Sequence, residues 1–213
     1  MASGPEWDLP TRVFHWALVV LVVFSFTTGK IGGAWMAWHM KSGYAILALL
    51  VFRLAWGVVG SPTARFSSFV RGPRAAAAYA RSLALGDRTL ARGHNPLGAW
   101  MVVLLLALLL LQVATGLFSN DDSSHEGPLA AKVSNAVVDR MSWIHGVNQG
   151  VLVGAVAVHV AAVALYQWGL KMDIIRPMIF GKTTRPALLA LAAALLAASA
   201  AGVYALVVIY PKG

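Results

Sequence analysis

Five long apolar runs dominate this sequence and restrict what it can fold into. They cover residues 13–29, 43–60, 97–118, 147–168 and 187–210. A transmembrane helix needs roughly 20 consecutive apolar residues, so each run is long enough to cross a bilayer. Hydrophobic residues make up 59% of the chain and charged residues only 12%, which is about half the charged share of a typical soluble domain. The sequence therefore predicts an all-α integral membrane helical bundle with five transmembrane helices.

The first run is expected to remain as a helix rather than to be removed as a signal peptide. Acidic Glu6 and Asp8 precede it in place of a basic segment, and no short apolar core with a cleavage site follows. Two other segments are interpreted structurally. Residues 73–85 are rich in alanine and predict a short helix lying on the membrane surface. The run 97–118 is almost entirely apolar and predicts a helix that faces lipid and carries no functional group.

The net charge of +9 is distributed unevenly over the two sides of the predicted membrane. One side has five basic residues, which are Lys30, Lys41, Lys132, Arg140 and Lys212. The other side has eleven, which are Arg12, Arg65, Arg71, Arg74, Arg81, Arg88, Arg92, Lys171, Arg176, Lys182 and Arg185. Loops rich in Lys and Arg stay in the cytoplasm, so we expect a multi-pass protein of the bacterial inner membrane with a cytoplasmic N-terminus and a periplasmic C-terminus. Topology and contact with membrane lipid explain the charge, and no nucleic-acid partner is expected.

The sequence has no cysteine, and this removes several redox cofactors from consideration. Disulfides, iron–sulfur clusters and covalently attached c-type haem all require cysteine. Any haem in this chain is therefore held non-covalently.

Histidines in or beside the apolar runs carry the main functional signal, because ionisable groups inside a membrane are rare and usually functional. His145 and His159 belong to the fourth helix and are 14 residues apart. An α-helix turns 100° per residue, so the two side chains lie about 40° apart on one face and about 21 Å apart in depth. A helix that binds two haems, one above the other, must present two histidines on one face at two depths. His39 lies at the outer depth of His145 and His15 at the inner depth of His159, so we predict these two pairs as iron ligands.

A lone membrane histidine is more often a packing or hydrogen-bonding residue, and the haem hypothesis depends on four histidines at matched depths. Arg53 extends the pattern, because it lies 14 residues after His39 and so on the same helix face at the inner depth. A haem propionate is the expected counter-charge for an arginine there. Gly43 and Gly150 are candidate positions for close approach of a flat macrocycle, although glycines also serve plain helix packing.

Three further polar residues, Arg12, His94 and His125, lie outside this pattern. Arg12 precedes His15 by three residues and is a candidate cofactor-binding residue. His94 is expected to cap the third helix or to contact a propionate rather than to bind iron. His125 lies in an outer loop, residues 119–140, that holds four acidic residues, and it is expected to be solvated. No catalytic residue is predicted.

Several of these residues lie in segments that closely resemble the bacterial cytochrome b561 family, which includes the b-type cytochrome subunits of membrane-bound nickel–iron hydrogenases. The resemblance extends over about residues 7–185. It is carried by Trp-Asp-Leu-Pro-Thr-Arg-Val-Phe-His-Trp (7–16), His-Met-Lys-Ser-Gly (39–43), Phe-Arg-Leu (52–54), Gly-His-Asn-Pro-Leu-Gly (93–98), His145 and His159.

The resemblance implies a four-helix transmembrane core that binds two b haems through His15, His39, His145 and His159. It divides the chain into this core, residues 1–185, and an additional C-terminal transmembrane helix, residues 186–213, whose role is open. Family members pass electrons between the quinone pool, ubiquinone or menaquinone, and a redox partner such as a periplasmic cytochrome c, a hydrogenase or a dehydrogenase. We therefore expect an electron-transfer subunit rather than a self-contained enzyme.

Two alternative functions remain at this point. One family branch oxidises superoxide and reduces ubiquinone without a partner, but that branch commonly has Glu where this chain has Gly146. The acidic outer loop also opposes the attraction of an anionic substrate. The second alternative is a non-redox transporter or proton relay that uses the same histidines.

Overall fold

Five long helices form the protein in a computed structural model that describes residues 7–86, 95–121, 125–181 and 183–212. Each is long and apolar enough to cross a membrane, which confirms the predicted all-α membrane bundle. The helices are α1 (Leu9–Ile31), α2 (Met36–Val59), α5 (Pro96–Gly116), α6 (Asn135–Ala164) and α8 (Pro186–Tyr204). Short π-helical segments, Leu165–Gly169 and Ala205–Ile209, extend α6 and α8.

The short elements lie at the ends of these helices. They include the helices α3 (Phe66–Phe69), α4 (Pro73–Ala84) and α7 (Ile175–Phe180). Helix α4 confirms the helix predicted over residues 73–85. A 3-10 turn, Gly33–Trp35, links α1 to α2, so the loop between them is very short.

Two of the long helices begin at polar caps that the sequence supplies. The Asp8 carboxylate accepts a hydrogen bond from the backbone N–H of Thr11 at 2.7 Å, which caps α1. The Asn95 side chain accepts one from Gly98 N at 2.8 Å, which caps α5. In both helices a proline follows the cap directly or after one residue, where its missing N–H costs nothing.

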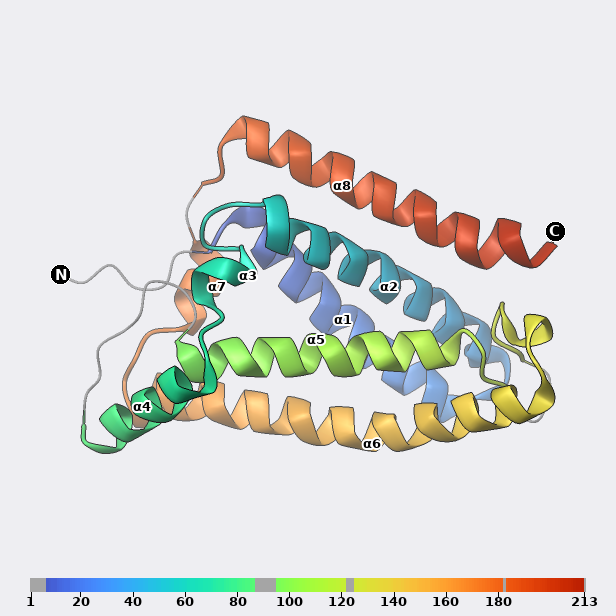
Figure 1. Cartoon of the computed structure of the whole chain (residues 1–213), viewed down its shortest axis with the longest axis horizontal. Coiled ribbons are helices and arrows are strands. Elements are labelled where there is room, and N and C mark those ends of the chain that lie inside the picture. The colour runs from blue at the N-terminus through green and yellow to red at the C-terminus, as the bar shows by residue number, and fades with distance from the viewer. Residues whose placement is uncertain (1–6, 87–94, 122–124, 182, 213) are drawn as a thin grey trace.

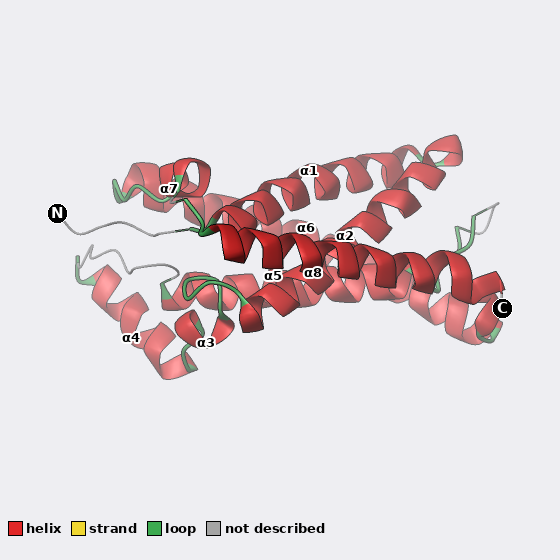
Figure 2. Cartoon of the chain, turned by 90° about the horizontal axis from the view of Figure 1, so that it is seen from above, coloured by secondary structure: helices red, strands yellow, loops and turns green. Residues whose placement is uncertain are grey.

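The long helices are arranged as two hairpins and one additional helix (Figure 1). Helices α1 and α2 form the first hairpin, α5 and α6 form the second, and contacts between α2 and α5 join them. Helix α8 packs along α2. We call the end of the bundle at the N-terminus, where α1 begins, the N-side, and the opposite end the C-side (Figure 1). Figure 2 shows α7 beside the beginning of α1 and α4 at the same N-side.

Helix α2 is the centre of the bundle. Of its apolar segment, 44% is buried, against 11–17% in the other four long helices. Leu50 and Trp56 are completely buried, and they belong to a core cluster with residues of α1, α5, α6 and α8. A helix packed on several sides by other helices is largely shielded from lipid, so α2 can carry polar side chains such as Arg53 within the bundle.

Candidate functional site

His39 of α2 and His145 of α6 face each other near the C-side of the bundle. Their ring centroids are 6.1 Å apart and their planes are at 88°. Two imidazoles that each bind one metal ion through a bond of about 2 Å have ring centres roughly 6 Å apart. Among the described residues no three His, Cys, Asp or Glu side chains gather closely enough to hold a metal ion. The 6.1 Å spacing by itself would allow both imidazoles to bind one metal ion.

The tautomer of both rings is fixed by acceptors on neighbouring helices. His39 Nδ1 lies 2.8 Å from the backbone oxygen of Ser25 on α1, and 3.2 Å from the Ser25 hydroxyl. His145 Nδ1 lies 2.9 Å from the backbone oxygen of Gln112 on α5, and 3.2 Å from the Thr115 hydroxyl. A carbonyl can only accept, so each Nδ1 carries the proton and each Nε2 keeps its lone pair for a metal.

Two glycines make room for these rings. A Cβ at Gly29 of α1 would lie 2.7 Å from His39 Nδ1. A Cβ at Gly116 of α5 would lie 3.0 Å from His145 Cε1. Each of the two histidines thus lies against a glycine of the other helix in its own hairpin, which lets the imidazole reach the backbone carbonyl.

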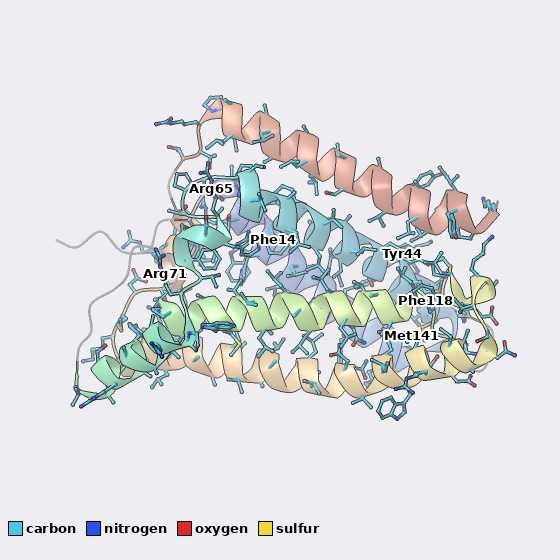
Figure 3. The ribbon with its side chains drawn as sticks, viewed as in Figure 1. Phe14, Tyr44, Arg65, Arg71, Phe118 and Met141 are labelled. Atoms are coloured by element: carbon cyan, nitrogen blue, oxygen red, sulfur yellow. The ribbon has the colours of Figure 1, made fainter. Side chains whose placement is uncertain are left out.

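A largely apolar cavity of about 320 Å³ adjoins the two histidines, which is within the usual size range of a ligand pocket. All four helices of the two hairpins line it and α8 does not. Gly43 of α2 is part of the lining and a Cβ there would meet open space. In Figure 3, Tyr44, which also lines the cavity, lies on the C-side, while Phe14 lies toward the N-side.

His15 and His159 form the second pair of histidines that face the interior. They lie within electrostatic range of each other, on α1 and α6, nearer the N-side. The His15 ring contacts the edge of Trp16 with centroids 5.1 Å apart. Within the described parts of the chain, His15 Nδ1 is buried and has no hydrogen-bond partner. The second pair is therefore less strongly fixed than the first.

Arg53 is 2% exposed and has protein partners on the N-side. Its guanidinium donates a hydrogen bond to the Ala64 carbonyl at 3.2 Å and lies 4.7 Å from the centre of the Phe66 ring. The Asp8 carboxylate also attracts it electrostatically. Asp8 in turn accepts hydrogen bonds from Trp56 Nε1 and the Ser61 hydroxyl. The protein thus supplies a carboxylate near Arg53, where the sequence pattern suggested a haem propionate.

The structure places the remaining candidates as follows. Arg12 donates a hydrogen bond to the Ile179 carbonyl at 2.7 Å and so joins α1 to α7. Gly150 lies on α6, outside the cavity lining, where a Cβ would meet open space. His125 lies 3.2 Å from Asp121 and forms an ion pair when protonated, so it is not simply solvated. His94 lies outside the described residues.

Sequence reasoning missed the residues that orient the C-side histidines. Helix α5, interpreted as a lipid-facing wall, packs against α2 and α6 and supplies acceptors for His145. Gln112 is the only amide side chain in the run 97–118, and Thr115-Gly116 follows three residues later. An isolated amide in an apolar run was the available signal, because a polar group in a membrane helix needs a partner.

A model of the family described as prokaryotic cytochrome b561 matches residues 6–181 of the chain. The match covers the four helices that line the cavity and ends before α8 begins at Pro186. No curated protein and no solved structure gives a significant match.

Proposed function

Because the chain belongs to the prokaryotic cytochrome b561 family and is a multi-pass membrane b-type cytochrome of electron transfer, we propose that it holds two b haems and conducts electrons across the bacterial inner membrane. The quinone pool, ubiquinone or menaquinone, exchanges electrons with the protein at one end of this path. A redox protein, such as a hydrogenase, a dehydrogenase or a periplasmic cytochrome c, exchanges electrons with it at the other end.

The facing pair His39 and His145 is the observation that carries this proposal. Their 6.1 Å separation would let both imidazoles hold one iron, and both Nδ1 atoms are already engaged by carbonyls. A haem iron held by two imidazoles exchanges single electrons and has no open position for O₂. The protein supplies the two Nε2 atoms and a largely apolar cavity beside them.

The second haem is assigned to His15 and His159, nearer the N-side. Arg53 and Arg12 are the candidate partners for its propionates, together with His94. Arg53 already interacts with Asp8, so a propionate there would share the arginine with a protein carboxylate. The 14-residue spacing of His145 and His159 on α6 supports two haems at two depths.

The positive-inside rule assigns the N-side to the cytoplasm and the C-side to the periplasm. Figure 1 has α4, with its arginines, on the N-side and the loop between α5 and α6 on the C-side. The redox protein then docks at the C-side, close to His39 and His145. The alternative of a superoxide oxidase receives no support, because Gly146 follows His145 in place of the acidic residue of that branch.

The test is a haem count on purified, fully haem-loaded protein. A pyridine haemochrome assay and the reduced absorbance spectrum should give two b haems per chain. His125→Ala, in the C-side loop, is a matched control and should also retain two haems. One haem per chain, or none, would contradict the proposal.

A further inference from the structure

Two amide side chains connect α5 to α6 at the turn that carries His145. Gln112 Nε2 donates a hydrogen bond to the backbone oxygen of His145 at 3.1 Å, while the Gln112 backbone oxygen accepts from His145 Nδ1 at 2.9 Å. The same two residues are thus joined twice, once in each direction. A shift of α5 relative to α6 at this turn would therefore strain both bonds, and the register that sets the carbonyl opposite the imidazole is held by the Gln112 amide.

Asn148 completes the arrangement from the next turn of α6. Its Nδ2 donates to the Gln112 side-chain oxygen at 2.7 Å and to the Leu108 backbone oxygen at 3.0 Å. Gln112 therefore uses its amide N–H toward His145 and its amide oxygen toward Asn148. Asn148 holds the Gln112 side chain in the orientation that reaches the backbone of His145.

The position of these amides in the membrane makes their pairing informative. Asn148 is 4% exposed and lies next to Gln149 in the membrane-spanning part of α6. A buried amide without partners costs roughly 1–3 kcal/mol, so an apolar residue would be the simpler choice for helix packing alone. The neighbouring Gln149 lines the cavity, whereas the Asn148 amide is bonded to α5.

The other ligand of this pair is held differently. His39 Nδ1 has the backbone oxygen and hydroxyl of Ser25 as partners, and both belong to one residue. The described partners of Ser25 and His39 include no amide bridge comparable to Gln112 and Asn148. The α5–α6 hairpin therefore has a second layer of hydrogen bonds behind its ligand that the α1–α2 hairpin lacks.

We propose that Gln112 and Asn148 are positioning residues for His145 that keep its Nδ1–H bonded to a carbonyl and thereby lower the reduction potential of the C-side haem. Donation from Nδ1 makes the imidazole a more basic ligand, and a more basic ligand favours ferric iron over ferrous iron. The inference rests on the proposed function, because it takes His145 as a haem ligand. It adds the residues that tune one haem independently of the other.

The test compares the potentials of the two haems in Gln112→Met and Asn148→Leu, which keep approximate size and remove the amides. The haem lost in His145→Ala identifies the C-side signal. In Gln112→Met the ferrous-to-ferric ratio of the C-side haem at fixed potential should rise by about tenfold. For a one-electron couple this is an upward shift of its reduction potential by about 59 mV. The N-side haem should stay unchanged, as should both haems in Ser199→Ala, whose hydroxyl bonds only Leu195 of its own helix α8.

A double variant separates positioning from a general loss of stability. Since Asn148 acts through Gln112, the double variant should shift the C-side potential no further than Gln112→Met alone. Additive shifts, equal shifts of both haems, or an unchanged C-side potential would overturn the inference. If His145→Ala instead kept both haems, the ligand assignment in the proposed function would be wrong.

Discussion

The imidazole rings of His39 and His145 belong to different hairpins, yet they are perpendicular to each other with centroids 6.1 Å apart. Since one iron would need both, His39→Ala and His145→Ala should each remove the same haem from the reduced spectrum. His15→Ala and His159→Ala should each remove the other. Spectra combined with potentiometric titration of the four variants would check this. Loss of one common haem signal in His39→Ala and His159→Ala would refute the pairing.

The glycines beside His39 and His145 should accept an added methyl group poorly. In Gly29→Ala the new methyl group would meet His39 Nδ1 at 2.7 Å, so the ring must tilt off its carbonyl at a cost of about 1–3 kcal/mol. Gly116→Ala, with a 3.0 Å contact, should have a smaller effect in the same direction. We expect weaker retention of the C-side haem, measured as haem loss during detergent incubation. Gly202→Ala on α8, where a Cβ meets open space, is the control and should match the parent protein.

The buried carboxylate of Asp8 should stabilise the N-side in two separable ways. Asp8→Asn keeps a good helix cap but removes the charge that attracts Arg53, and it puts an amide NH₂ where an oxygen accepted from Trp56 Nε1 and Ser61, which should together cost about 1–3 kcal/mol. Asp8→Ala also removes the cap and should cost about 1 kcal/mol more. Unfolding in denaturing detergent measures both. If Asp8→Asn/Arg53→Leu proved no more stable than Asp8→Asn, the charge explanation would fail.

The acidic loop between α5 and α6 should attract a basic periplasmic electron carrier. Asp121 and Glu126 belong to its described part, where residues 120 and 126 pair as an isolated β-bridge, and Asp122 lies outside the described residues. Asp121→Asn/Glu126→Gln should slow electron transfer to such a carrier by on the order of tenfold at low salt and weaken its salt dependence.

Stopped-flow kinetics at several ionic strengths would measure this effect. Asp173→Asn removes an acidic charge on the N-side and should leave the rates unchanged. Equal rates for the double variant and the parent at low salt would rule out electrostatic docking at this loop.

Much of the fold could be predicted from sequence because a bilayer accepts so few structures. Apolar runs alone identified the five transmembrane helices, and the 14-residue spacing placed His145 and His159 on one helix face. Helix ends were predicted less well. Helix α6 begins at Asn135, well before its apolar run, since hydropathy marks the lipid-facing part of a helix and not its hydrogen-bonded length.

The polar contacts between helices could not be predicted in the same way. The bonds from His39 to Ser25 and from His145 to Gln112 depend on which helices become neighbours, and periodicity within one run does not contain that information. For the same reason the sequence pattern did not reveal Asp8 as a counter-charge for Arg53. Asp8 attracts it electrostatically only because the start of α1 packs beside the end of α2, where Asp8 bonds Trp56.

The division of the C-side site between two hairpins has a consequence for biogenesis. Each hairpin orients its own imidazole through contacts made within that hairpin, Ser25 with His39 in one and Gln112 with His145 in the other. The orientation of the His39 ring therefore requires no residue of the second hairpin, so we expect it to be set as soon as α1 and α2 have paired. On the proposed function, a haem bound by both histidines would span the two hairpins and would add to the α2–α5 contacts that hold them together, so loss of haem should loosen the junction between the hairpins.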